Sequence, residues 1–182
     1  HFPVADASLI AAHVERSFGI EQVRALKPSF AAATHETVEQ IVGEAAKFAD
    51  RHLGSLNDLA DAGGCRVECG RVKTAPTHYE AWEAYVAAGW PTLDQPEASG
   101  GQGLPLVVAA AVQEMFDRNC PAFGMLAVWQ RAASKLIADY GDDAVVAEWL
   151  PKLASGEWGA TICISEVEAG SDAGRMRTMA TP

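Results

Sequence analysis

The sequence lacks three features: a long hydrophobic run, a cluster of basic residues and a closely spaced set of cysteines. Its most apolar stretch, residues 104–112, has about half of the ~20 residues that a membrane-spanning helix needs. The first residues also lack the basic and then apolar pattern of a secretory leader. We therefore expect a cytoplasmic protein with no membrane partner.

The shortage of basic residues excludes one large class of partners. Lysine and arginine number 14 against 24 aspartates and glutamates, which gives a formal net charge of -10. No run of basic side chains is present that would neutralise a phosphate backbone. Nucleic acid is therefore excluded as a partner, whereas a small anion could still be held by one or two local arginines.

The few cysteines are scattered: they are Cys65, Cys69, Cys120 and Cys163. Three residues separate the one close pair, one more than in a typical zinc knuckle, and no second pair or neighbouring histidine completes a ligand set. We expect no metal site, and we expect the cysteines to be reduced thiols, as is usual inside cells.

The sequence does have the composition and the helical periodicity of a globular protein. Of its 182 residues, 49% are hydrophobic and 21% are charged, which is enough for one sizeable core. Thr37 and Gln40 have the spacing of a capping box, and Gly89 is expected to end a helix. Apolar residues recur at three- and four-residue steps, which predicts helices over residues 5–18, 34–53, 79–88, 104–118, 121–140 and 142–150.

The helix predicted over 121–140 carries apolar side chains that we expect to face the core, namely Phe123, Leu126, Ala127, Trp129, Ala133, Leu136 and Ile137. Residues 60–76 contain several glycines and polar residues, which predicts a long loop with room for a short hairpin. Pro151 is expected to begin a new turn after the last helix.

A different pattern begins after residue 156. Over residues 160–165, apolar and polar side chains alternate and several are β-branched, which predicts a strand. The predicted fold class is therefore mainly α: an antiparallel helical bundle followed by the first strand of a β-domain.

The loop after this strand contains small and polar residues at 169–172. Gly170 allows a ligand to approach the main chain closely, and the strand end exposes backbone donors and acceptors that suit a planar heteroaromatic ring. Ser171, with Arg175 and Arg177 nearby, could meet a phosphate or another anion. The pattern is also typical of an ordinary turn, so the spacing alone leaves both interpretations open.

Several motifs in order give the chain a family resemblance. They are PKLASGEW at 151–158, ICISEVEAGSD at 162–172 and RT at 177–178, preceded by EAW at 80–82, AGWP at 88–91, GGQGLP at 100–105, EM at 114–115, Asn119 and AF at 122–123. Together they resemble the FAD-dependent acyl-CoA dehydrogenases, most closely the longer bacterial members. The resemblance implies an N-terminal accessory helix at 1–33, a helical domain of that family at 34–157 and the start of its middle β-domain at 158–182.

The resemblance also implies a cofactor site. Ile162, Cys163, Ile164 and Ser165 would lie beside the isoalloxazine ring of FAD, with the Ser165 hydroxyl directed toward its reactive nitrogen region. Ser171 would lie at the mouth of the acyl-CoA channel and bind the cofactor or the CoA. Glu166 matches a family position that is mostly structural, so it is not expected to be the catalytic base.

Two departures from the family pattern bear on these expectations. Val167 replaces a proline and Glu168 replaces a small or neutral residue, which could weaken flavin or CoA binding because a carboxylate now lies near an anion-binding loop. Trp129 and Arg131 stand in a segment, 126–132, where relatives tend to carry Pro-x-Leu-Thr-x-Gly-Ala. That segment helps to shape the acyl-chain pocket in the family, so an unusual substrate is conceivable.

The activity implied is α,β-dehydrogenation of an acyl-CoA thioester, with hydride transfer to FAD and an electron-transfer flavoprotein or similar acceptor as partner, in a homo-oligomer. The family's base is a glutamate of a C-terminal helical domain, so no catalytic residue is assigned in this chain. We expect the chain to be an N-terminal fragment that is inactive alone. Two alternatives stay open: a non-catalytic helical interaction subunit descended from the family, and an acyl-CoA oxidase.

Overall fold

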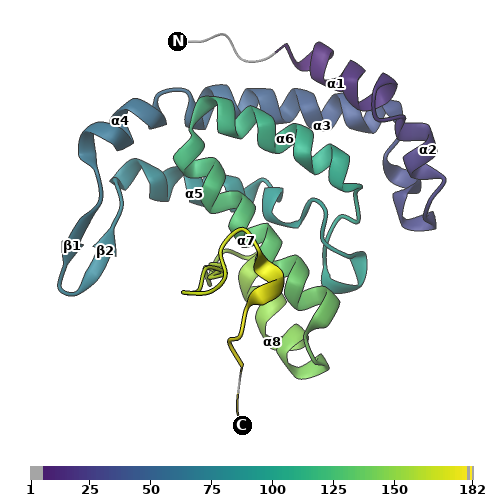
Figure 1. Cartoon of the computed structure of the whole chain (residues 1–182). Coiled ribbons are helices and arrows are strands. Elements are labelled where there is room, and N and C mark those ends of the chain that lie inside the picture. Colours follow the sequence, from purple (N-terminus) through teal and green to yellow (C-terminus); the bar gives the residue numbers. More distant parts are fainter. Residues whose placement is uncertain (1–5, 180, 182) are drawn as a thin grey trace.

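The computed structural model describes residues 6–179 and 181, and it is mainly helical, as predicted (Figure 1). The helices are α1 (Ala7–Arg16), α2 (Ile20–Arg24), α3 (His35–Phe48), α4 (Leu56–Gly63), α5 (Pro76–Ala87), α6 (Leu106–Asn119), α7 (Pro121–Tyr140) and α8 (Asp143–Ala154). A π-helical turn, Ala49–Leu53, extends α3, and short 3-10 turns lie at Pro28–Ala32, Trp90–Thr92, Glu97–Ser99 and Ala173–Arg175. No helix in the described part of the chain is long and apolar enough to cross a membrane.

One predicted helix cap and one predicted helix end are wrong. The Thr34 hydroxyl, not that of Thr37, caps α3 by accepting a hydrogen bond from the Thr37 amide at 3.2 Å, because the helix begins three residues earlier than a cap at Thr37 would require. Pro151 does not begin a new turn but lies inside α8, which continues to Ala154. Asp142 caps α8, since its carboxylate accepts from the Val145 amide at 2.8 Å.

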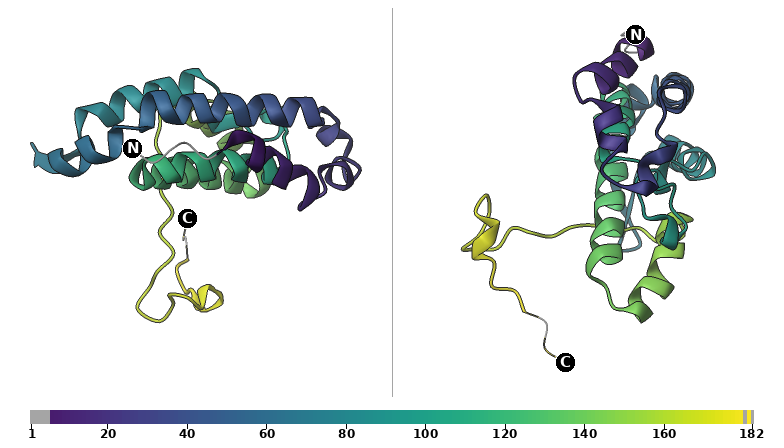
Figure 2. Two further views of the ribbon diagram at one scale, coloured as in Figure 1. Left: turned by 90° about the horizontal axis from the view of Figure 1, so that it is seen from above. Right: turned by 90° about the vertical axis from the view of Figure 1, so that its right-hand side faces the viewer.

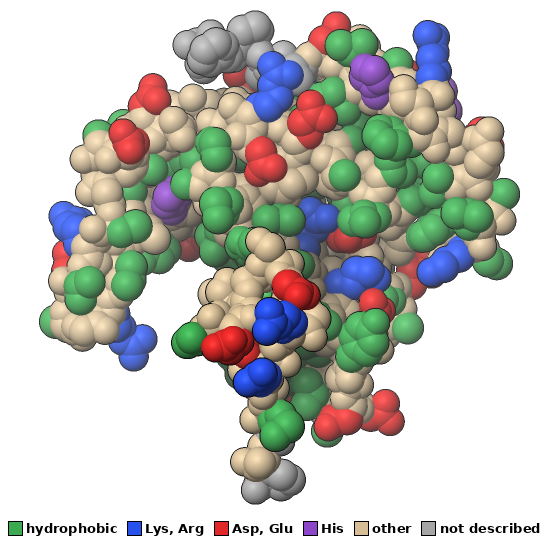
Figure 3. Space-filling view, viewed as in Figure 1, with side chains coloured by type: hydrophobic (Ala, Val, Ile, Leu, Met, Phe, Trp, Pro, Cys, Tyr) green, Lys and Arg blue, Asp and Glu red, His purple; other side chains and the backbone are tan. Residues whose placement is uncertain are grey.

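Residues 60–76 are more regular than a loop. Their first part belongs to α4, and their middle forms an antiparallel hairpin of β1 (Arg66–Glu68) and β2 (Arg71–Lys73), in which Val67 lies opposite Val72. The hairpin stands out at the left of Figure 1, and Figure 3 shows basic side chains on it. The cysteines are free thiols, and no group of potential metal ligands occurs among residues 6–179 and 181.

An aromatic cluster forms the centre of the bundle. Phe48 of α3, Tyr85 of α5, Trp90, Phe116 of α6 and Phe123 of α7 have ring centroids 5.2 to 6.5 Å apart. Burial raises the pKa of the Tyr85 hydroxyl well above its usual value. This cluster joins α3, α5, α6 and α7, and it therefore fixes these four helices relative to one another.

The accessory helix α1 packs on the bundle. Its Ile10 and Val14 are buried where α1 meets α3 and α6. Gly19, which directly precedes α2, has a φ of 61°. The first five residues of the predicted extension at 1–33, and residues 180 and 182 of the predicted 158–182 unit, lie outside the described residues.

The inward face of α7 differs from the prediction. Phe123, Ala127 and Ala133 are buried as expected, but Leu126, Trp129 and Leu136 are 45%, 41% and 55% exposed. The helix instead buries three polar residues, Gln130, Arg131 and Ser134, because each has a hydrogen-bonding partner inside the bundle.

The predicted strand at 160–165 does not form within the described residues. A strand requires a neighbouring strand for its main-chain hydrogen bonds, and here the stretch runs away from the bundle as a single chain (Figure 2). We refer to residues 159–179 as the C-terminal segment.

Candidate functional site

The C-terminal segment leaves the bundle at a point set by Gln130. This side chain, 1% exposed, donates through Nε2 to the carbonyl oxygens of Leu153 at 3.0 Å and Trp158 at 2.9 Å. Its Oε1 accepts from the Ala160 amide at 2.7 Å. One amide group therefore joins α7, the end of α8 and the start of the segment, and we call these three hydrogen bonds the Gln130 clamp.

Neighbouring side chains hold the same exit. The Lys152 ammonium lies 4.0 Å from the centre of the Trp158 ring, and Trp149 packs edge-on against that ring at 5.7 Å. Gly156 has a φ of +70°, and a Cβ there would lie 2.6 Å from the Val86 Cγ2. Only glycine therefore fits this bend, for both steric and conformational reasons.

The predicted cofactor residues lie just beyond the clamp. Ile162 is half-buried, whereas Cys163, Ile164 and Ser165 are exposed, as is Ser171 further along. Within residues 6–179 and 181, the main-chain groups of 162–165 make no hydrogen bond. Four consecutive residues thus present their N–H and C=O groups outward, where a ligand can bind them.

Glu166 closes the loop that follows. Its amide donates to the Ala169 carbonyl at 2.7 Å, and the Ala169 amide donates back at 3.3 Å. The Glu166 carboxylate accepts from the Arg177 amide at 2.8 Å, from the Thr178 amide at 2.9 Å and from the Thr178 hydroxyl. The Thr178 hydroxyl and the two amides lower the pKa of Glu166 below its usual 4.5. Ser171 lies within this closed loop. The Val167 side chain, in the same loop, is fully exposed.

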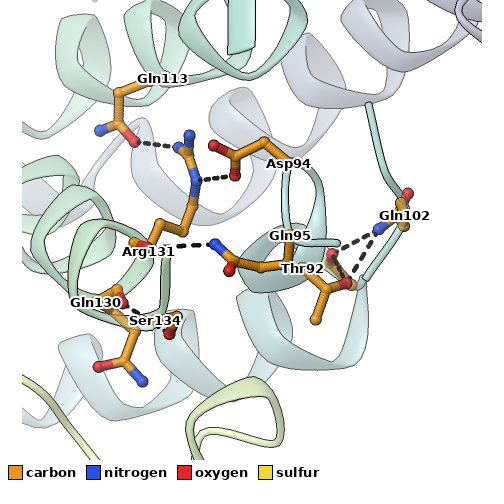
Figure 4. Close-up of polar contacts among 9 residues, drawn as sticks. Thr92, Asp94, Gln95, Gln102, Gln113, Gln130, Arg131 and Ser134 are labelled. Atoms are coloured by element: carbon orange, nitrogen blue, oxygen red, sulfur yellow. Dashed lines mark hydrogen bonds and ion pairs between the residues drawn. The ribbon is translucent and has the colours of Figure 1, made fainter. Parts of the chain in front are cut away.

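A second set of polar residues lies inside the bundle between α6 and α7 (Figure 4). The Arg131 guanidinium donates through Nε to Asp94 at 3.0 Å and through Nη1 to the Gln113 Oε1 at 3.2 Å. The Gln95 Nε2 donates to the Arg131 carbonyl at 3.2 Å. The side chains of Arg131 and Asp94 are 8% and 6% exposed. We call Asp94, Gln95, Gln113 and Arg131 the Arg131 cluster.

Gln113 extends this cluster to the start of α7. Its Nε2 donates to Asp117 at 2.8 Å and to the Gly124 carbonyl at 2.9 Å. A Cβ on Gly124 would collide with the Asp117 carboxylate and would lie 3.0 Å from the Gln113 Nε2. The absence of a side chain at Gly124 therefore allows α6 and α7 to approach closely.

A groove of about 510 Å³ lies beside the Arg131 cluster, within the usual size range of small-molecule sites. Both apolar and charged side chains line it: Leu106, Ala110, Gln113, Glu114, Asp117, Arg118, Val128 and Arg131. A second hollow of about 700 Å³ lies between α1 and α6 and shares Leu106, Ala110, Glu114 and Arg118 with the first. Side chains of all three kinds, apolar, acidic and basic, are interspersed over the face seen in Figure 3. The groove can thus hold an apolar chain with a polar group at one end.

Sequence reasoning identified some of these residues and missed others. It singled out 162–165, Ser171 and Arg131, and the structure places Arg131 in the groove, whose lining includes no residue of the C-terminal segment. It missed Asp94, Gln95, Gln113 and Gln130. One signal was available: the adjacent polar residues Gln130 and Arg131 interrupt an otherwise apolar stretch of α7.

Comparisons with known proteins agree on one family. The family model for the acyl-CoA dehydrogenase N-terminal domain matches residues 35–157. The 3-methylmercaptopropionyl-CoA dehydrogenase of Ruegeria pomeroyi is 31% identical over 180 residues, which are 99% of this chain and 30% of the relative. The (2S)-methylsuccinyl-CoA dehydrogenase of Cereibacter sphaeroides is 41% identical over 101 residues, 56% of this chain and 18% of the relative.

A human relative matches over a similar stretch. The mitochondrial very long-chain specific acyl-CoA dehydrogenase is 35% identical over 102 residues, which are 56% of this chain and 16% of the relative. The chain thus spans less than a third of the length of each of these curated relatives.

Proposed function

The chain belongs to the acyl-CoA dehydrogenase family, and from that membership we propose that it is the N-terminal part of a flavoprotein that removes hydrogen from the α and β carbons of an acyl-CoA thioester. One observation supports this proposal above the others. The main-chain groups of 162–165 are free of hydrogen bonds within residues 6–179 and 181, and the Gln130 clamp holds them at a defined exit from the bundle.

The residues present fit FAD. The edge of an isoalloxazine ring carries both hydrogen-bond donors and acceptors, and the exposed backbone of Ile162, Cys163, Ile164 and Ser165 offers both. FAD supplies the hydride acceptor for this chemistry. The Ser165 hydroxyl would bind near the reactive end of the ring, and Ser171 would bind the cofactor or the CoA.

The groove between α6 and α7 is proposed as the pocket for the acyl chain. Val128 and Arg131 line it, and both belong to the segment 126–132, which helps to shape the acyl pocket in the family. The role of this chain is to bind and orient the thioester, which reduces the entropy lost on reaching the reactive geometry. The base that removes the α-proton is proposed to be a glutamate of a C-terminal helical domain outside this chain.

The division of the chain and its partners are also part of the proposal. Residues 1–33 would form the accessory extension, 34–157 the helical domain and 158–182 the start of the β-domain. The electron acceptor would be an electron-transfer flavoprotein or a similar protein, and the full-length enzyme would be a homo-oligomer.

A second candidate function is a helical interaction subunit without catalytic activity. The exposed apolar side chains of α7 favour it, since Met125, Trp129 and Leu136 are 59%, 41% and 55% exposed. Such a face is typical of a protein contact. Binding of FAD separates the two candidates, because an interaction subunit needs no flavin.

The test is an anaerobic reduction experiment on the natural full-length protein. We expect a visible flavin spectrum that bleaches when a panel of acyl-CoA thioesters is added, and electrons that pass to an artificial acceptor. Ser165→Ala and Ser171→Ala should weaken flavin or thioester binding, whereas Ser55→Ala, a change at an exposed serine before α4, should not. A protein that binds no FAD would refute the proposal, and rapid reoxidation by oxygen would instead indicate an oxidase.

A further inference from the structure

Arg131 has more hydrogen-bond donors than protein partners. A guanidinium carries five N–H donors, and two hydrogen bonds are made, one from Nε to Asp94 and one from Nη1 to Gln113. No hydrogen bond within residues 6–179 and 181 uses Nη2. The side chain is 8% exposed, and Nη2 is not among the fully buried polar atoms that lack a partner, so this donor still meets water in the groove. A ligand that displaces this water must supply an acceptor in its place.

The remaining donors lie beside an apolar wall. Arg131 lines the groove of about 510 Å³ together with Leu106, Ala110 and Val128. Arg131 and Gln113 are hydrogen-bonded to each other at the polar part of this wall (Figure 4). An acyl chain lying along Leu106, Ala110 and Val128 would bring one of its atoms next to the guanidinium.

The charges around the groove determine which kind of atom fits there. Asp94, Glu114 and Asp117 contribute three carboxylates, and Arg118 and Arg131 contribute two guanidiniums, so the local formal charge is -1. The Arg131 charge is already paired with Asp94 at 3.0 Å. A further carboxylate on the substrate would be repelled by this surplus of negative charge, whereas a neutral oxygen would not.

We propose that Arg131 is a specificity-determining residue that donates a hydrogen bond to a neutral acceptor, such as an ether, carbonyl or hydroxyl oxygen, on the acyl group of the substrate. The inference rests on the proposed function. It narrows the substrate class from acyl-CoA thioesters in general to those with an oxygen in the acyl chain. A plain alkyl chain would displace water from the free donor without replacing its hydrogen bond, and sites built to hydrogen-bond a substrate discriminate strongly against analogues that lack the polar group.

The test compares isosteric substrates in the natural full-length enzyme. Hexanoyl-CoA is measured against its 4-oxa and 5-oxa analogues, in which one methylene is replaced by oxygen, and against adipoyl-CoA, which carries a terminal carboxylate. We expect kcat/KM for at least one oxa analogue to exceed that for hexanoyl-CoA and for adipoyl-CoA by about 10-fold or more. A wild-type preference for hexanoyl-CoA or adipoyl-CoA would overturn the proposal.

Variants assign the preference to Arg131. Arg131→Met alone leaves Asp94 buried without its partner, which can prevent folding, so the main variant combines Asp94→Leu with Arg131→Met and removes both charges. In this double variant the ratio of kcat/KM for the oxa analogue to kcat/KM for hexanoyl-CoA should fall to about 1. Lys135→Met, which changes a half-exposed lysine on the same helix, should keep the wild-type ratio.

Each outcome has a separate meaning. A double variant that keeps the oxa preference would show that Arg131 does not determine it, and the inference would fail while the proposed function stood. A wild-type enzyme that oxidises none of the thioesters would refute the proposed function itself. If the double variant does not fold, the wild-type ratio still decides whether the substrate class is right.

Discussion

The helical bundle and the C-terminal segment differ in how far their side chains are buried and in where their hydrogen bonds go. In the bundle, several polar side chains are buried and paired, as in the contact of Arg131 with Asp94. In the segment, the apolar side chains of Ile164 and Val167 are 39% and 101% exposed. Apart from the Gln130 clamp on Ala160, the hydrogen bonds made by the segment join it only to itself.

This difference separates the part that carries stability from the part that is proposed to bind. A region with many buried apolar contacts is stable and rigid, whereas a region with few such contacts opens with a small free energy. The bundle gives the segment a fixed origin, and the segment offers backbone groups that a ligand can order. Four predictions test this division in the natural full-length protein, from the largest expected effect to the smallest.

The first prediction compares one large side chain in each region. Phe116→Ala removes a ring at the centre of the aromatic cluster and should destabilise the bundle by about 3 to 5 kcal/mol, because Phe116 is 1% exposed. Ile164→Ala in the segment should have almost no effect on stability. Native-state hydrogen exchange of the α6 amides measures both. Equal losses of exchange protection in the two variants would contradict the proposal that the bundle carries the stability.

The second prediction breaks the link between the regions. Gln130→Leu leaves the Trp158 carbonyl and the Ala160 amide without partners, whereas the Leu153 carbonyl keeps the Gly156 amide. The change should cost about 2 kcal/mol, at roughly 1 kcal/mol for each orphaned group. Exchange protection of the Ala160 amide should be lost, and FAD affinity should fall with it.

The control for this prediction is Gln95→Leu. Gln95 is also buried, but it donates one hydrogen bond to the Arg131 carbonyl and does not touch the segment. Gln95→Leu should lower stability without changing the exchange protection of the Ala160 amide. The clamp would have no special role if both variants changed that amide equally.

The third prediction concerns the bend before the segment. Gly156→Ala should destabilise by about 2 kcal/mol, because φ is +70° and the new Cβ would press on Val86. Gly159→Ala is the matched control, since nothing lies within 4 Å of its Cβ position. Thermal unfolding and exchange at residues 158–160 distinguish them. A tolerated alanine at 156 would mean that the exit is adaptable.

The fourth and smallest effect is the pH dependence of the loop. The pKa of Glu166 is lowered in the folded protein, so the hydrogen bonds of the carboxylate contribute above its unfolded pKa of about 4.5 and are lost as pH falls through the lower folded value. Exchange protection at Arg177 and Thr178 should therefore decrease from about pH 5 to about pH 3.

A variant gives the same information at neutral pH. Glu166→Gln should increase tryptic cleavage after Arg175 and Arg177, because the Arg177 and Thr178 amides lose a charged acceptor. Glu168→Gln, a change at an exposed glutamate next to the same loop, should not. Unchanged cleavage in both variants would show that the loop is closed by other contacts.

Local rules predicted the helices well and the polar interior poorly. The bounds of α7 at Pro121–Tyr140 follow from its periodicity and its first proline. The same periodicity placed Trp129 on the inward face, whereas the structure buries the neighbouring Gln130. The reason is that the partners of Gln130 are 23 to 30 residues away, and no pattern within one helix encodes them.

The candidate site could likewise be predicted only in part. The bend of the loop after residue 165 agrees with its glycine-containing sequence, but a strand at 160–165 requires a neighbour that the pattern does not supply. Arg131 stood out as a departure from the family pattern. Its position in a groove could not be predicted, because Asp94 and Gln113, which orient it, lie on other elements.

The Gln130 clamp also has a consequence for the order of assembly during synthesis. Domains fold as their chain emerges from the ribosome, N-terminal parts first, so α7 and its Gln130 exist before Trp158 and Ala160 are made. Because the partners are at most 30 residues apart, closing this loop is entropically inexpensive. A finished bundle can thus capture the new chain as it appears and set the starting point from which the following residues fold.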